Sequence, residues 1–204
     1  MAPPDDSISL AAALDGWLSA IEPLTLDGWQ SSQTWIFGHT ARGRVCPYGT
    51  EYGNQGIFEQ PRQLAAISGF YRAFGLQLAR HGRERADHAC CELEFLGFLC
   101  RKEAFAAETG DQASLQETQK AARLFLRDHL GRFASAFASL LQEHDPVGFY
   151  RELGRFLSTF LAHLCRHFDV PPGPAMLRLR PEDDGPAPMA CGGSEELVQL
   201  RLPS

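Results

Sequence analysis

Residues 85–106 read RADHACCELEFLGFLCRKEAFA, and this stretch decides the fold class. At 100° per residue its leucines and phenylalanines point in nearly every direction around a helix, which is typical of a helix at the centre of a helical protein. The pattern predicts a buried central helix from residue 87 to about residue 107. Asp87 is its expected N-cap residue, because a carboxylate there accepts backbone N–H groups and suits the positive end of the helix.

The flanking segments share the helical period, while Val and Ile are scarce and no alternating strand pattern occurs. Further helices are expected over residues 7–21, 26–37, 61–78, 115–130 and 133–144, and a last one beginning at Asp145-Pro146. The sequence therefore predicts an all-α protein: one compact helical-bundle domain over residues 1–170. Residues 171–204 are rich in Pro and Gly and are expected to form an extended or disordered tail that buries little apolar surface.

Composition excludes several classes of protein. The chain has 204 residues and a formal net charge of −6, which argues against a nucleic-acid partner. No stretch of about 20 apolar residues is present, so no membrane insertion is expected. The N-terminal sequence MAPPDDSISL lacks the basic start of a secretory signal, and six cysteines are too few for a disulfide scaffold. Both observations favour reduced thiols and a cytoplasmic location.

The loop CPYGTEYG, residues 46–53, combines two aromatic side chains and a carboxylate with two glycines. Tyr48 and Tyr52 flank Glu51, and the glycines permit backbone conformations that other residues resist. One interpretation is a contact surface for a basic, partly apolar ligand. The other is a structural loop whose tyrosines fill the core.

Carboxylates also occur among the leucines of the predicted central helix. His88 and Glu92 are i,i+4 neighbours and can pair. Glu92 and Glu103 lie on one side of the helix, and an unpaired buried charge is very costly. These acids either line a cleft for a cationic ligand or pair with basic residues of neighbouring helices.

Evidence for catalysis or for a metal is weak. His163 and His167 have a spacing that can hold a metal, but no acid of the HExxH type lies between them. No phosphate-binding loop, dinucleotide fingerprint, nucleophile elbow or EF-hand is present. We expect no metal and no enzyme activity. The rival hypothesis is a helical metal-dependent enzyme that uses His88, Glu92, His163 or His167.

Four segments in order resemble the redox-enzyme maturation chaperones of the TorD/DmsD/NarJ type. They are FGHTARGRVCPYGTEYG (residues 37–53), QLAAISGFYRAFGL (63–76), RADHACCELEFLGFLCRKEAFA (85–106) and FLRDHLGRF (125–133). The loop departs from the PPYET-like sequence that family members often have, and fewer helices precede it.

The resemblance implies an all-helical, cofactor-free chaperone. It would bind the twin-arginine signal peptide of the catalytic subunit of a molybdopterin oxidoreductase, assist cofactor insertion and delay export. As a monomer or homodimer it would act in the cytoplasm; the alternative is a scaffold subunit retained in a redox complex. The residues expected to form its peptide-binding site are acidic or aromatic and belong to the two best-matching segments: Tyr48, Glu51, Tyr52, Asp87, His88 and Glu92.

Overall fold

The computed structural model describes residues 9–38, 43–53, 59–78, 84–145 and 147–180. Within these ranges the chain is helical, and the only β-type pairing consists of two isolated bridges. The predicted all-α class is confirmed. The helices are α1 (Leu10–Ser19), α2 (Leu26–Phe37), α3 (Glu59–Ala73), α4 (Ala89–Thr109), α5 (Gln112–Phe125), α6 (Gly131–His144) and α7 (Phe149–His167).

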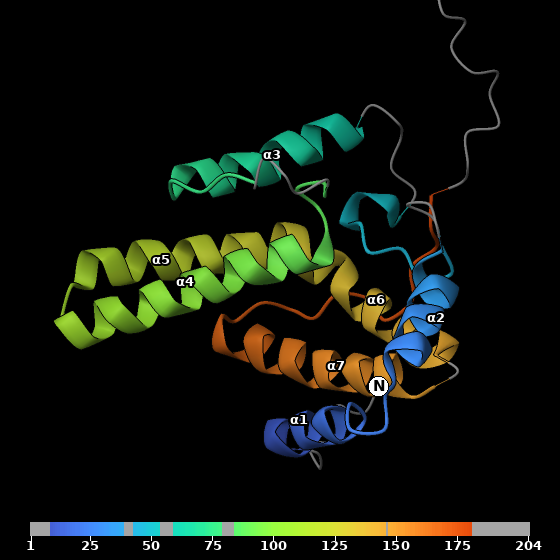
Figure 1. The fold of residues 1–204 in the computed structure, drawn as a ribbon. Coiled ribbons are helices and arrows are strands. Elements are labelled where there is room, and N and C mark those ends of the chain that lie inside the picture. The colour runs from blue at the N-terminus through green and yellow to red at the C-terminus, as the bar shows by residue number, and fades with distance from the viewer. Residues whose placement is uncertain (1–8, 39–42, 54–58, 79–83, 146, 181–204) are drawn as a thin grey trace, which may run out of the picture.

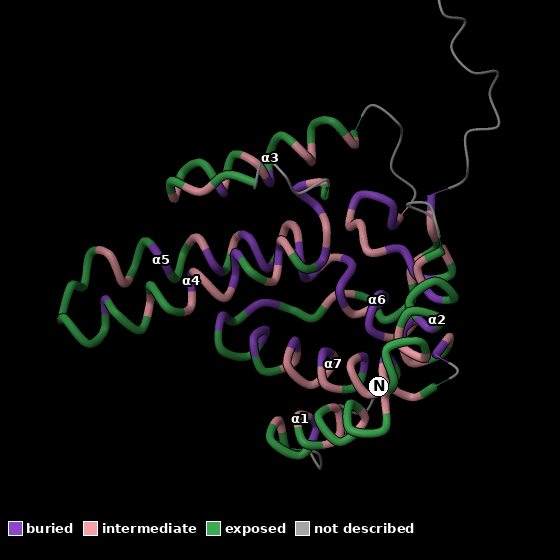
Figure 2. The backbone as a smooth tube through the Cα atoms, viewed as in Figure 1, coloured by how far each residue is buried: buried purple, intermediate pink, exposed green. Residues whose placement is uncertain are grey.

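Helices α4 and α5 form an antiparallel pair (Figure 1). Helix α6 packs on one side of α7, and α1 also packs on α7. Helix α3 lies across the side of the α4–α5 pair that faces away from α7. Helix α4 buries Phe95, Leu96 and Leu99 and holds Leu93 and Phe98 half-buried, so the prediction of an apolar central helix is confirmed. Figure 2 shows that the buried residues gather where α4, α5, α6 and α7 meet.

Helix α4 begins two residues later than predicted, because a different side chain caps it. His88 is the N-cap residue, and its Nδ1 accepts a hydrogen bond of 3.2 Å from the backbone N–H of Cys90. The prediction that Asp87 caps the helix is wrong. Its carboxylate instead accepts four hydrogen bonds, which Arg85 and Thr50 donate.

The ends of the first three helices agree with the expected ones only in part. Helix α2 has the predicted bounds, with Thr25 as its cap. Helix α1 is capped by Ser9. Helix α3 ends at Ala73 rather than residue 78, because Gly75 takes a left-handed conformation with φ of +73°.

The expected break near Gly131 is instead a π-helical turn, Leu126–Leu130, that joins α5 directly to α6. A Cβ on Gly131 would lie 2.3 Å from the Leu126 carbonyl oxygen, so only glycine permits this wide turn. The last helix begins at Phe149, because the Asp145 carboxylate accepts hydrogen bonds from the backbone N–H groups of Val147 and Arg151 and so stays outside the helix.

Residues 171–180, the first part of the predicted tail, are extended but packed. The N–H of Gly53 donates to the carbonyl of Arg178 at 2.9 Å, and the N–H of Arg180 donates to the carbonyl of Glu51 at 2.8 Å. These residues are extended, as predicted, and six of the ten are exposed, while Arg180 at their end is buried. The remainder of the predicted tail lies outside the described residues.

None of the described helices is both long and apolar enough to cross a bilayer. The five described cysteines form no disulfide with one another.

Candidate functional site

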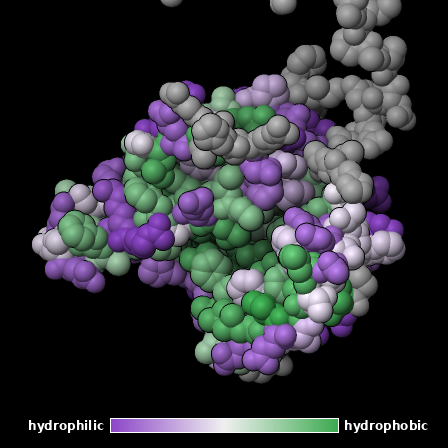
Figure 3. All heavy atoms as spheres, viewed as in Figure 1, coloured by the Kyte–Doolittle hydropathy of each residue, from purple (hydrophilic) through white to green (hydrophobic). Residues whose placement is uncertain are grey.

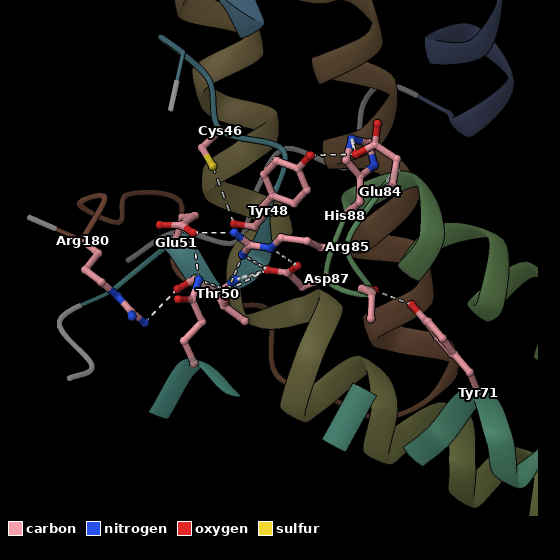
Figure 4. Close-up of polar contacts among 12 residues, drawn as sticks. Cys46, Tyr48, Thr50, Glu51, Tyr71, Glu84, Arg85, Asp87, His88 and Arg180 are labelled. Carbon is pink, nitrogen blue, oxygen red and sulfur yellow. Dashed lines mark hydrogen bonds and ion pairs between the residues drawn. The ribbon is translucent and has the colours of Figure 1, made fainter. Parts of the chain in front are cut away.

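The centre of the predicted site is a buried ion-pair cluster built on Arg85, whose side chain is 31% exposed (Figure 4). The fully buried Asp87 accepts hydrogen bonds from Arg85 Nε at 2.9 Å and Nη2 at 2.7 Å. It also accepts from the N–H of Thr50 at 3.0 Å and its Oγ1 at 2.7 Å. Burial alone would raise the pKa of Asp87, but these bonds hold it below its ordinary value.

Glu51 belongs to the same cluster. Its Oε1 lies 2.8 Å from Arg85 Nη1 and accepts a 2.9 Å hydrogen bond from Gln60 Nε2. The structure thus brings the two predicted carboxylates together around a guanidinium of the chain itself. This arrangement fixes the loop from Tyr48 to Gly53 against the start of α4.

The two tyrosines of the loop have different surroundings, and only Tyr52 fills the core as the structural interpretation predicts. Tyr52 is buried, donates its hydroxyl to the Cys46 carbonyl at 2.7 Å and packs on Phe133. Tyr48 is half-buried and donates to Glu84 Oε2 at 2.7 Å. Its ring meets the His88 ring edge-on, with centroids 5.2 Å apart.

A groove with mostly apolar walls, called the apolar groove here, forms a cavity of about 870 Å³. Tyr48 and His88 lie at its polar side. Figure 3 shows a hollowed hydrophobic surface between the α4 side of the molecule and helices α1 and α7. The groove walls are mostly aromatic and aliphatic, with Glu84 as the carboxylate at the edge, and include Trp17, Phe37, Leu93, Leu153, Phe156 and Phe160. The sequence prediction missed these walls, since the apolar face of residues 149–164 resembled ordinary core.

Glu92 lies apart from the groove, on the other side of the loop. It is 1% exposed, and its Oε2 has no hydrogen-bond partner among the described residues. It faces a second cavity of about 330 Å³, lined also by Gly49, Arg132 and Phe133. Burial raises the pKa of Glu92 well above its ordinary value; nearby Asp87 adds to this, and Arg132 opposes it.

We expect Glu92→Gln to stabilise the protein at neutral pH. The unfolded chain ionises Glu92 at an ordinary pKa, whereas the folded chain keeps it protonated to higher pH, so its contribution to stability is lost as the pH rises through the folded pKa. The loss amounts to about 1.4 kcal/mol for each unit of the shift. Urea unfolding at pH 4 and pH 8 should show the variant gaining on the parent only at pH 8. An equal difference at both values would contradict the assignment.

Gly49 allows the loop to approach α6, and Gly49→Ala should be clearly destabilising. A Cβ there would lie 2.6 Å from Phe133 Cε1 and 3.3 Å from Glu92 Oε1, and the Phe133 ring is held by Tyr52. Overpacking of this kind costs about 1–3 kcal/mol.

Gly69→Ala, in α3, is the matched control, because nothing lies within 4 Å of its added Cβ. Urea unfolding should show this control as stable as the parent or slightly more stable. Similar losses in both variants would show that the loop does not require glycine at position 49.

The predicted pairs of the other candidate residues differ from the observed ones. His88 lies 3.8 Å from Glu84 rather than pairing with Glu92. Glu103 accepts hydrogen bonds from Gln119 Nε2 at 2.8 Å and contacts His167 Nε2 at 3.2 Å.

His163 contacts Arg166 rather than His167, with 3.1 Å between the Arg166 Nη2 and His163 Nδ1 atoms. Across the described ranges, no group of three His, Cys, Asp or Glu side chains is placed to hold a metal ion. The rival metal-dependent site is therefore not assembled from these residues.

Comparison with known proteins gives consistent results. Residues 4–139 match the family model of the nitrate reductase delta subunit. The chain is 33% identical over 117 residues to the selenate reductase assembly chaperone protein of Thauera selenatis, covering 57% of this chain and 55% of the relative.

Two further relatives carry similar names. The chlorate reductase assembly chaperone protein of Ideonella dechloratans is 33% identical over 122 residues, 59% of this chain and 58% of the relative. The chaperone protein TorD of Vibrio cholerae is 26% identical over 131 residues, 62% and 56% of the two chains. The chain thus spans little more than half the length of the curated relatives it matches.

Proposed function

The chain belongs to the nitrate reductase delta subunit family, and we propose that it is an assembly chaperone for the catalytic subunit of a molybdopterin oxidoreductase. The family model covers residues 4–139, and the matching relatives are named as assembly chaperones for selenate and chlorate reductases. These names describe no reaction of the chaperones themselves, in agreement with the prediction that the chain is not an enzyme.

The proposed ligand is the N-terminal signal peptide of that catalytic subunit, a segment with an arginine pair followed by an apolar run. The observation that carries this proposal is the apolar groove with its single acidic edge. The groove walls offer aromatic and aliphatic surface to the apolar run. At the edge the Glu84 side chain is 51% exposed, and its carboxylate can accept a guanidinium in bidentate fashion.

In this proposal four of the six predicted site residues divide into two roles. Tyr48 and His88 line the groove and contact the peptide. Glu51 and Asp87 do not line the groove. They hold Arg85 by ion pairs, and its guanidinium lies 4.5 Å from the centre of the Tyr48 ring. The ion-pair cluster thereby sets the position of the tyrosine at the groove edge.

The chaperone would hold the client in the cytoplasm until the molybdenum cofactor has been inserted and would release it for export afterwards. Binding of the signal peptide in the groove would produce this order of events, because a bound peptide would be withheld from the export machinery.

The test uses native mass spectrometry with the catalytic subunit of a molybdopterin oxidoreductase from the same organism. We expect a complex with the cofactor-free precursor that carries its signal peptide, and a much weaker one with the same subunit lacking the peptide. Equal binding of both forms would contradict signal-peptide recognition and favour a retained scaffold subunit.

A further inference from the structure

The described end of the chain lies along the loop of the ion-pair cluster. Residues 177–180, Leu-Arg-Leu-Arg, are called the strap here. Tyr52 and Leu179 form an antiparallel bridge, and the two backbone hydrogen bonds between the loop and the strap, at 2.8 and 2.9 Å, flank it. The loop therefore presents a short backbone edge that accepts one extended segment.

Side chains of the strap add specific contacts to this backbone pairing. Leu177 and Leu179 pack against the hydrophobic core. Arg180 is 9% exposed, and its Nη2 donates a 2.9 Å hydrogen bond to the Thr50 carbonyl (Figure 4). The edge thus selects an extended segment with apolar side chains and a buried arginine.

The chain just before the strap makes a close contact with the body and is then exposed. A Cβ on Gly173 would lie 1.9 Å from the Gly131 carbonyl oxygen, so residue 173 is held tightly. Met176, just before the strap, is 87% exposed. Three exposed residues, 174–176, therefore separate the strap from the tight contact at residue 173.

We propose that the strap is an internal competitor of the client, occupying an edge that an extended segment of the signal peptide next to its arginine pair takes when it binds. This inference rests on the proposed function. Strap and signal peptide share their chemistry, since both are extended, basic and partly apolar. The edge and the apolar groove belong to the same loop, because Tyr52 lies on the edge and Tyr48, four residues earlier, lines the groove.

The test compares three full-length variants. Arg180→Ala removes the guanidinium contact with Thr50 and should open the strap. Arg178→Ala is the matched control, because it removes the same charge from an exposed side chain and keeps the carbonyl that Gly53 uses. Leu179→Ala is a second opening variant, and far-UV circular dichroism checks that all three fold.

The first probe is a labelled synthetic peptide, AMLRLR, with the sequence of residues 175–180. Fluorescence anisotropy should show it binding to Arg180→Ala about tenfold more tightly than to the parent or to Arg178→Ala, the scale of one lost hydrogen bond from a charged donor. Equal affinities for all four chains, with hydrogen exchange showing an open strap in Arg180→Ala, would overturn the proposal.

The second probe is a synthetic twin-arginine signal peptide. It should displace AMLRLR from Arg180→Ala and bind this variant about tenfold more tightly than it binds the parent. A signal peptide that binds without displacing AMLRLR would overturn the shared edge and leave the proposed function standing. A signal peptide that binds no variant, while AMLRLR still binds Arg180→Ala, would instead show that the proposed function itself has failed.

Discussion

Asp87→Asn should lower the free energy of unfolding by about 3 kcal/mol, the scale of breaking a buried ion pair from one side. The substitution leaves the Arg85 guanidinium with Glu51 as its remaining carboxylate partner. It also places an NH₂ group beside the Thr50 N–H, which donates to the carboxylate in the parent. Urea unfolding at neutral pH measures the loss.

Asp128→Asn is the matched control, because Asp128 pairs with Arg127 on the surface, at 2.7 Å. An exposed pair contributes about 1 kcal/mol or less. Equal losses in the two variants would show that the buried cluster contributes no more to stability than an exposed ion pair.

Acidification should destabilise the parent for the same reason as the substitution, because it removes the negative charge of Asp87. The folded pKa of Asp87 lies below its ordinary value, so its stabilisation is present above the ordinary aspartate range and is lost as the pH falls through the folded pKa. The stability of Asp87→Asn should therefore fall less than that of the parent on acidification.

Leu93→Ala and Leu153→Ala should each weaken binding of a twin-arginine signal peptide about tenfold. Leu93 lies on α4 and Leu153 on α7, and both are half-buried in the groove wall. Each truncation removes apolar surface that the peptide would cover, at about 25 cal/mol per Å², and a tenfold change corresponds to about 1.4 kcal/mol. Isothermal titration calorimetry measures the affinity at a temperature where both variants are folded.

Leu26→Ala is the control for the groove variants. Leu26 is 67% exposed at the start of α2 and does not line the groove. It should leave the peptide affinity unchanged. If the groove variants bind as tightly as this control, the peptide does not use the groove.

The fold could be predicted from the sequence because its main determinant is local. The all-round apolar pattern of residues 85–106 identified the central helix, and α2 has the predicted bounds. Errors arose where a distant partner decides. Asp87 is a good N-cap residue by local rules, but Thr50, 37 residues away, offers it better hydrogen bonds, and His88 caps the helix instead.

The candidate site could be predicted in part. Glycines, tyrosines and an acid mark the loop, and Tyr48, Glu51, Asp87 and His88 lie close to one another around Arg85. The role of Arg85 could not be predicted, since an arginine four residues before a helix has no local signature of a buried partner. The groove walls run from Trp17 to Phe160, and only the folded chain brings them together.

The strap carried a weak signal in the sequence. Leu177 and Leu179 alternate with two arginines, which is the pattern of a half-buried extended segment. The surrounding prolines and glycines suggested a tail instead, and four residues are too few for composition to distinguish the two.

The central claim is that this chain binds a signal peptide through an acidic-edged apolar groove. Its most direct test is calorimetric titration of the full-length parent with the twin-arginine signal peptide of a molybdopterin catalytic subunit from the same organism, and with a twin-lysine version. We predict one peptide per chain, weaker binding of the twin-lysine peptide because lysine lacks the bidentate fork, and further weakening with salt and in Glu84→Gln. No binding, or equal binding of a scrambled peptide of the same composition, would contradict the account.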